Sequence, residues 1–205
     1  MRRFIMEFLG TFFFILTIAL TNNPFAIASM LMAWVYIGAF VSGAHYNPMV
    51  SLAIAMRRRL SWDDLPTYMV AQIAGGFAAF AAAAFLHGHI TIPAPGAEVT
   101  MMQAFVVEIL LAFALALVIL FVATSEKYSG NDIFGLAIGF TIPALAYLGG
   151  PISGGLFNPA IALGAALYGL VSGVHVSYHH LAMYLGGAFI GGALAAHAFD
   201  YFTEE

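Results

Sequence analysis

The sequence contains no cysteine and very little charge. Of its 205 residues, 8% are charged and 62% are hydrophobic, whereas a soluble domain carries about 25% charged residues. So few charged side chains cannot cover a surface that faces water, and we therefore expect the outside of the protein to face lipid. The lack of cysteine excludes disulfides and thiolate metal sites. With only six basic residues, the sequence gives no support for nucleic-acid binding.

Long apolar runs follow one another along the whole chain. About 20 apolar residues of helix cross a bilayer core, and the sequence predicts six such spans, at residues 4–20, 25–41, 61–86, 101–122, 132–148 and 178–199. Arg2 and Arg3 before the first run also resemble the start of a signal peptide, but similar runs recur down the chain, which favours a membrane span. The predicted fold class is an all-α membrane protein with a single transmembrane domain over residues 1–205.

The basic residues indicate the orientation of the chain in the membrane. If the N-terminus is cytoplasmic, every basic residue falls on the cytoplasmic side, as the positive-inside rule requires; these residues are Arg2, Arg3, Arg57, Arg58, Arg59 and Lys127. We therefore expect a multi-pass protein of the cell membrane whose N- and C-termini are both cytoplasmic.

One sequence pattern occurs twice, in residues 42–56 and 153–167. Each copy reads Ser-Gly, a small residue, a variable residue, an aromatic residue, Asn-Pro and then an apolar stretch. Asparagine is a strong helix N-cap and proline is favoured at the first helical position. Each copy therefore predicts a glycine-rich loop that turns into a helix too short to cross the membrane. The two tripeptides at the helix starts are Asn47-Pro48-Met49 and Asn158-Pro159-Ala160.

The two halves of the chain look like copies of each other. Asn47 and Asn158 are 111 residues apart, the Gly75-Gly76 pair has a match at Gly186-Gly187 with the same spacing, and Glu7 and Glu108 lie in similar stretches at a spacing of 101. Three spans per copy is an odd number, so the copies, about residues 1–95 and 96–205, should have opposite orientations. Inverted repeats with a broken helix in each half are typical of transport proteins, whose site lies near the middle of the membrane.

The two short helices predict the chemistry of a pore. Non-helical backbone at membrane depth persists only where it is buried in protein or lines water, so we expect both loops to line a cavity. Each helix N-terminus carries roughly +0.5 of a charge, and Asn47 and Asn158 can direct N–H groups at a passing water while cations are repelled. The alternative is that both asparagines act only as caps. The expected pore-lining carbonyls belong to Gly43, Ala44, His45, Tyr46, Gly154 and Leu156.

The doubled motif, the six spans, Glu7 and Glu108 together resemble the aquaporin or major intrinsic protein family, over essentially the whole chain. The resemblance implies an aquaporin-like right-handed bundle of six transmembrane helices plus two re-entrant half-helices. It also implies a homotetramer with one pore per subunit, and passive flow of water or small uncharged solutes such as glycerol-like molecules. It implies neither catalysis nor a cofactor.

The sequence departs from the family pattern next to the second motif. Most members have an arginine there, and glycerol-type members then have an aspartate, but this chain has Ile161 and Ala162. Such a filter would be wide and apolar, although Phe25 or Tyr147 would enter it if the register differs slightly. Met49, in place of the usual alanine, is expected to narrow or reshape the pore. Counted from the motifs, the family's selectivity filter falls on Ile27, Ala146, Gly155 and Ile161.

Glu7 and Glu108 are the acidic residues that lie well inside predicted spans. An ionisable residue at a helix centre costs about 2.5–3.5 kcal/mol on insertion scales, so it is a functional candidate. The two acids are either a proton relay or structural acids that accept hydrogen bonds from the loops, and the family resemblance favours the structural role. A secondary transporter would need them as its ion site, and an ion channel is a further alternative. No nucleophile–base pair or metal-ligand spacing points to an enzyme.

Overall fold

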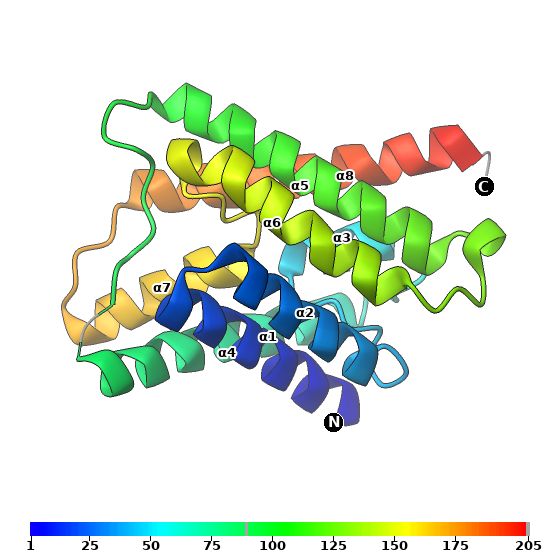
Figure 1. The fold of residues 1–205 in the computed structure, drawn as a ribbon, viewed down its shortest axis with the longest axis horizontal. Helices are drawn as coiled ribbons and strands as arrows, with labels where there is room; N and C mark the ends of the chain where they lie inside the picture. Colours follow the sequence, from blue (N-terminus) through cyan, green and yellow to red (C-terminus); the bar gives the residue numbers. More distant parts are fainter. Residues whose placement is uncertain (89, 204–205) are drawn as a thin grey trace.

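The computed structural model describes residues 1–88 and 90–203, which form eight α-helices and one short 3₁₀ helix (Figure 1). The helices are α1 (Arg2–Thr21), α2 (Pro24–Gly38), α3 (Pro48–Met56), α4 (Leu65–His87), α5 (Met101–Thr124), η1 (Glu126–Tyr128), α6 (Phe134–Ser153), α7 (Pro159–Ser172) and α8 (Tyr178–Thr203). The two predicted short helices are present as α3 and α7, and each begins at the proline of its motif. Both chain ends lie at one end of the bundle, opposite the long α4–α5 loop.

Five of the described helices, α1, α4, α5, α6 and α8, are long and apolar enough to cross a membrane. α2 has 15 residues and is shorter than predicted, but helical hydrogen bonds continue beyond it, from Ser42 N to Gly38 O (2.9 Å) and from Gly43 N to Ala39 O (3.2 Å). α6 is longer than predicted and runs to Ser153 through Pro143 and Pro151. Proline is tolerated in a membrane helix because neighbouring groups can satisfy the backbone atoms that it frees.

Local capping explains where several helices begin. Asn23 caps α2 by accepting hydrogen bonds from Phe25 N (3.0 Å) and Ala26 N (3.1 Å). Thr100 and Gln103 form a reciprocal capping box at the start of α5. Ser61, where the third predicted span begins, accepts from Asp63 N in a turn (3.2 Å), and α4 starts later, at Leu65.

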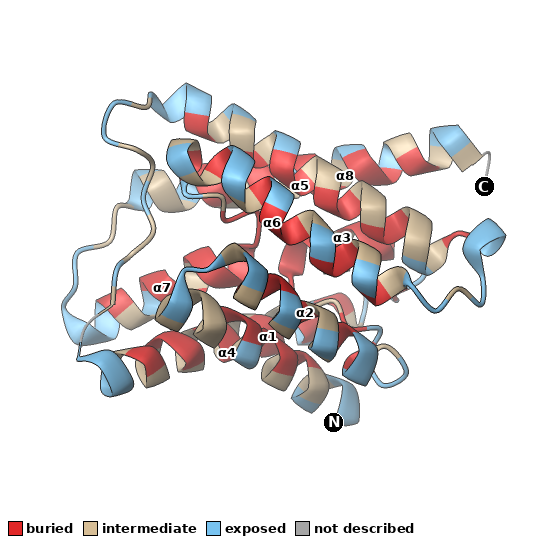
Figure 2. Ribbon diagram, in the orientation of Figure 1, coloured by how far each residue is buried: buried red, intermediate tan, exposed pale blue. Residues whose placement is uncertain are grey.

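The outer faces of the long helices are apolar and the polar groups lie inside. Figure 2 shows buried residues on the inner sides of the helices and exposed ones on the outer sides. Large side chains such as Phe85 (89% exposed), Phe140 (62%) and Leu110 (56%) point outward. Apolar surface of this extent is stable in lipid and not in water, so the chain is an integral membrane protein.

The helices of the two halves pack in matching ways. α1 packs along α4, and α5 packs along α8; α4 contacts α7, and α3 contacts α8; α2 and α6 contact each other across the two halves. α1 runs away from the end that holds both termini, whereas α5 runs toward it (Figure 1). This is the arrangement that an inverted repeat of four helices produces.

The structure corrects the register of the repeat in the last helix of each half. A Cβ atom added to Gly75 would lie 2.6 Å from Phe8 O, and one added to Gly191 would lie 2.3 Å from Ile109 O. Phe8 and Ile109 are 101 residues apart, as are Glu7 and Glu108, so Gly75 corresponds to Gly191 and not to Gly186. The spacing in this helix is therefore 116 and not 111.

The extra five residues lie after the second motif. α7 has 14 residues and α3 has nine, so α8 starts later relative to its motif than α4 does. Tyr68 and Tyr184, also 116 residues apart, donate hydrogen bonds to equivalent carbonyls, those of Ser42 and Ser153. The match at 111 in these two helices was a coincidence between glycine-rich segments.

Substitution of Gly76 tests how closely α4 and α7 approach. A Cβ atom at Gly76 would lie 2.4 Å from Ala160 O, so Gly76→Ala must push the helices apart, at a cost of about 1–3 kcal/mol. We expect a lower midpoint of thermal unfolding in detergent. Gly150→Ala is the control, because nothing lies within 4 Å of its added Cβ atom. An equal effect of both substitutions would contradict the close approach.

Candidate pore and its supporting network

Glu7 of α1 holds the loop that precedes the first motif. Its carboxylate is fully buried and accepts hydrogen bonds from Ser42 Oγ (2.6 Å), His45 N (3.1 Å), Tyr46 N (2.7 Å) and Gln72 Nε2 (2.8 Å). Hydrogen bonds to an ionised group are about twice as strong as neutral ones. Both oxygens are occupied, so the four hydrogen bonds offset the cost of burying the carboxylate and hold the loop in one conformation.

Glu108 of α5 does the same for the second loop. It is also fully buried and accepts from Ser153 Oγ (2.6 Å), Leu156 N (3.0 Å) and Phe157 N (2.6 Å). The two serines, both part of the repeated pattern, are equivalent, and so are the two pairs of backbone donors. Each acid therefore holds the loop that leads to the asparagine of its own half.

Both loops contain strained backbone. Ala44 (φ 56°), Tyr46 (φ 50°) and Phe157 (φ 30°) have positive φ angles, which side chains with a Cβ atom rarely adopt. Such residues cost on the order of 1–3 kcal/mol each and persist only where their surroundings hold them, often at functional sites. Here the carboxylates of Glu7 and Glu108 bind the N–H groups of the strained aromatic residues.

Asn47 and Asn158 join the two half-helices reciprocally. Each side-chain oxygen caps its own helix, accepting from Met49 N and Ala160 N, both at 2.9 Å. Each Nδ2 then donates to the loop of the other half: Asn47 to Phe157 O and Asn158 to Tyr46 O, both at 3.1 Å. Since an amide nitrogen has two hydrogens, one N–H of each asparagine is not used in these bonds.

Some carbonyls of the two loops accept a hydrogen bond from within the protein, and others do not. Tyr46 O and Phe157 O accept from the asparagines, while Ser42 O and Ser153 O accept from Tyr68 and Tyr184. Within the described residues, no intramolecular donor reaches the carbonyls between these ends, which include those of Gly43, Ala44, His45, Gly154 and Leu156. These loop carbonyls are left free to accept a hydrogen bond from another molecule.

Tyr46 anchors the first loop in a slot made by two glycines. Its ring is fully buried, its hydroxyl donates to Trp34 O (2.8 Å), and a Cβ atom added to Gly10 or Gly38 would collide with it. The second half is packed differently at this place. Leu111 stands at the position that corresponds to Gly10, and Phe157 stands at the position that corresponds to Tyr46. The sequence pattern identifies an aromatic residue in both loops but not its partners.

A polar network is present in the first half and absent from the corresponding described positions of the second. Gln72 Nε2 donates to both Glu7 (2.8 Å) and Ser51 Oγ (2.8 Å), and Ser51 Oγ lies 3.1 Å from His45 Nδ1. The corresponding residues in the second half are Ala188, Ala162 and Leu156, which are apolar. An amide such as Gln72 does not carry protons, so this chain of contacts fixes side chains and is not a proton path to Glu7.

The predicted filter residues lie on three helices and one loop. Ile27 is in the first turns of α2 and is buried, Ile161 is in the first turn of α7 and is buried, and Ala146 is half-buried on α6. Gly155 has φ +62°, and a Cβ atom added to it would lie 3.2 Å from Gly150 N of α6. Gly155 therefore lies beside the helix that carries Ala146, while Ile27 belongs to α2, which packs on that helix.

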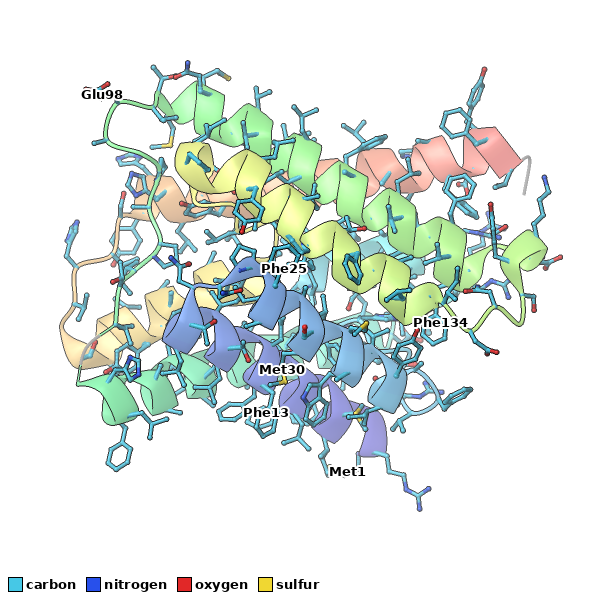
Figure 3. All side chains as sticks on the ribbon, in the orientation of Figure 1. Met1, Phe13, Phe25, Met30, Glu98 and Phe134 are labelled. Carbon is cyan, nitrogen blue, oxygen red and sulfur yellow. The ribbon has the colours of Figure 1, made fainter. Side chains whose placement is uncertain are left out.

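The two aromatic residues near the filter are exposed and contact each other. Phe25 is 55% exposed and Tyr147 is 62% exposed, with their ring centroids 6.3 Å apart. Figure 3 labels Phe25 at the start of α2, where that helix passes α6. Among the four predicted filter residues, the buried side chains are those of Ile27 and Ile161.

The side chain of Met49 packs between α3 and α8. Its side chain is fully buried, and a Cβ atom added to Gly192 of α8 would lie 2.6 Å from Met49 Cγ and 2.8 Å from Sδ. The side chain therefore fills the space that Gly192 opens between α3 and α8. Met49 therefore separates a half-helix from the bundle wall, and the expectation that it narrows or reshapes the pore stays a prediction.

Several supporting residues were not singled out from the sequence. Gln72 is the clearest, because an uncharged polar side chain inside an apolar span usually has a buried partner. Ser42 and Ser153 are 111 residues apart, as the two motifs are, and this equal spacing indicates that they share a role. Tyr68 and Tyr184 give no such signal, since their correspondence depends on the corrected register. In the described residues, no group of three His, Cys, Asp or Glu side chains could hold a metal ion.

Two capped half-helices that meet inside a bundle of membrane helices, with free loop acceptors beside them, define the class of protein: a membrane channel, not an enzyme. Comparisons with known proteins give the particular family. The family model described as "Major intrinsic protein" matches residues 1–199, and the chain belongs to this family. It is a channel for water and small neutral solutes.

Curated relatives and a solved structure agree with this assignment. Over 95% of its length the chain is 35% identical to aquaporin NIP1-4 of Oryza sativa, of which it covers 74%. Over 83% of its length it is 34% identical to nodulin-26 of Glycine max, of which it covers 61%. The X-ray structure of the aquaglyceroporin from Plasmodium falciparum matches with a TM-score of 0.85 at 22% identity, covering 97% of this chain and 95% of that one. The predicted fold class is confirmed.

Replacement of Met49 by alanine separates its packing role from a role in the pore. Loss of this buried side chain leaves a cavity against Gly192, and such truncations cost about 2–5 kcal/mol. We expect Met49→Ala to lower the midpoint of thermal unfolding while the order of permeation among neutral solutes stays as in the native protein. Stopped-flow light scattering on proteoliposomes measures that order. A changed order in a correctly folded variant would return Met49 to the pore.

Proposed function

We propose that the pore of this channel runs past Asn47 and Asn158 and passes neutral solutes that are bulkier or less polar than water. The reciprocal bonds between the asparagines and the opposite loops support a narrow centre where one N–H of each asparagine meets the permeating molecule. A water held there oxygen-first passes a proton along the file only poorly, and the two helix N-termini repel cations. The motif residues are Asn47, Pro48, Met49, Asn158, Pro159 and Ala160.

The observation that carries the solute proposal is Ile161. It is a buried aliphatic side chain one position after the second motif, and every arginine of the chain lies at residue 2, 3, 57, 58 or 59. A filter of Ile27, Ala146, Gly155 and Ile161 has no fixed charge and lacks the five donors that an arginine carries. A less polar solute gives up fewer hydrogen bonds to water when it enters such a filter. The filter should therefore pass less polar solutes more readily than a filter shaped strictly for water.

Glu7 and Glu108 belong to this proposal as structural acids. Their carboxylates are occupied by loop donors in both halves, which supports a role in shaping the pore rather than in moving protons. We further propose a homotetramer in the cell membrane, with both termini in the cytoplasm, since all basic residues then lie on the cytoplasmic side. The permeating partners are water or small neutral solutes, with lipid around the assembly.

The solute proposal predicts the behaviour of proteoliposomes in a stopped-flow panel of water, glycerol, urea and a larger neutral solute. We expect faster re-swelling with glycerol-sized solutes than with impermeant ones, and we expect Ile161→Arg to reduce glycerol flux roughly tenfold by filling the filter. Ile161→Leu is the control, because it conserves volume and polarity. Equal osmotic shrinkage with glycerol and with an impermeant solute would refute the proposal.

Loss of the filter arginine leaves ion exclusion to the region of Asn47 and Asn158. We therefore expect measurable proton entry into sealed vesicles that contain the native protein, and less entry with Ile161→Arg, which restores a fixed positive charge. A pH-sensitive dye inside the vesicles reports the flux. If both proteins leak equally, the proposed role of position 161 in ion exclusion is wrong.

The alternatives make different predictions in the same vesicles. A secondary transporter would show solute flux that depends on a proton or sodium gradient, whereas a passive channel would not. An ion channel would give single-channel currents in a planar bilayer. The burial and full occupancy of Glu7 and Glu108 favour the passive channel.

A further inference from the structure

The side chain of Gln72 joins Glu7 and Ser51 through a single atom. It is fully buried, and its Nε2 lies 2.8 Å from a carboxylate oxygen of Glu7 and 2.8 Å from Ser51 Oγ. That Glu7 oxygen also accepts from Tyr46 N (2.7 Å), and an amide oxygen facing it would bring two acceptors together. The contact is therefore made by the amide nitrogen, which donates one of its two hydrogens to Glu7 and the other to Ser51.

The amide oxygen of Gln72 is left without a partner by this arrangement. Within the described residues, Gln72 Oε1 is buried and accepts no hydrogen bond. A buried acceptor without a partner is unfavourable, so the two bonds from Nε2 decide how this side chain is held.

The donor direction continues from Ser51 to His45. Ser51 Oγ accepts from Gln72 and lies 3.1 Å from His45 Nδ1, and within the described residues it has no other hydrogen-bond partner. Its own hydrogen therefore goes to Nδ1. A neutral imidazole has a single N–H, and the ring nitrogen that accepts is the one without a hydrogen. The hydrogen of the His45 ring therefore lies on Nε2.

The Nε2 edge of the His45 ring is accessible beside the first loop. A Cβ atom added to Gly43 would lie 3.0 Å from Nε2 and 3.3 Å from Cδ2, and Gly43 is exposed. In the described part of the chain Nε2 has no hydrogen-bond partner, and it is not among the buried polar atoms that lack one. The loop groups next to it, the free carbonyls of Gly43 and Ala44, are acceptors.

We propose that Gln72 is a positioning residue that holds His45 as its Nε2–H tautomer, so that the first loop offers the solute a donor among its carbonyl acceptors. The effect on solute flux rests on the proposed pore, whereas the tautomer does not. The second half lacks this chain of donors, because the residues that correspond to His45, Ser51 and Gln72 are Leu156, Ala162 and Ala188.

The substitution Gln72→Glu reverses the direction of the chain with little change of shape. Two carboxyl groups in contact share one proton, so the introduced carboxyl donates its O–H to Glu7 and has only its carbonyl oxygen left for Ser51. The Ser51 hydroxyl then donates to position 72 and accepts from His45, whose hydrogen moves to Nδ1.

Nuclear magnetic resonance of protein with isotope-labelled histidine rings reads the tautomer, since ring nitrogens with and without hydrogen resonate far apart. The signals of His45 are those missing from His45→Asn. At about pH 8, where an ordinary histidine is neutral, we expect Nε2–H in the native protein, Nδ1–H in Gln72→Glu and a mixture of both in Ser51→Ala. Ser51→Ala decides the matter if Gln72→Glu does not fold.

Gln103→Glu is the matched control for this spectrum. Gln103 is exposed in the first turn of α5, where a glutamate keeps the capping box, so this variant should show the native tautomer. Nδ1–H in the native protein, or the same tautomer in the native protein and in Gln72→Glu, would overturn the positioning role.

Flux into proteoliposomes tests whether the solute meets this donor. Urea and dimethyl sulfoxide are similar in size, but only urea has N–H groups to donate, so dimethyl sulfoxide depends more on a donor from the channel. We expect Gln72→Glu to raise the ratio of urea flux to dimethyl sulfoxide flux about fivefold, the effect of one hydrogen bond, whereas damage to the fold would lower both fluxes together.

The two measurements fail separately. An unchanged flux ratio in a variant whose tautomer has changed would refute the contact between His45 and the solute. If neither solute enters faster than into protein-free vesicles, the proposed pore is wrong, and the resonance spectrum still decides the role of Gln72.

Discussion

Everything at the centre of this channel depends on satisfying backbone N–H groups at membrane depth. The loops before Asn47 and Asn158 cannot be helical if two helix starts are to meet in the middle of the bundle, and lipid offers their N–H groups no partners. Glu7 and Glu108 supply those partners from neighbouring helices. The same bonds hold Tyr46 in a backbone conformation that it would otherwise avoid.

The two halves keep this interaction and differ around it. The first half adds Gln72, Ser51 and His45 to the network, whereas the second has apolar residues at the matching positions and an open pocket beside Leu156. The arrangement at the centre is symmetric because the acid, the serine, the tyrosine and the asparagine match in the two halves. The residues behind each loop are then free to differ, and they are polar in the first half and apolar in the second.

In the proposed channel, the residues that select the solute are separate from the hydrogen bonds that hold the two loops. The asparagines use one N–H each to brace the opposite loop, so the centre has little freedom to change without loss of the fold. The buried Ile161 lies one position beyond this braced region, where a side chain can change without breaking a loop bond. Under the proposed function, selectivity would therefore vary at the filter, while proton and cation exclusion would depend first on the centre.

The sequence by itself determined the membrane location, the number and place of the two short helices and the correspondence between Glu7 and Glu108. Composition, capping chemistry and repeat spacing can be read along the chain without knowing which helices touch. The tertiary structure alone decided where Met49 points and which glycines correspond in α4 and α8. It also decided what Gln72 binds. These depend on which helices touch: Met49 faces Gly192 only because α3 lies against α8, and Gln72 reaches Glu7 only because α1 packs along α4. No spacing along one chain encodes such contacts.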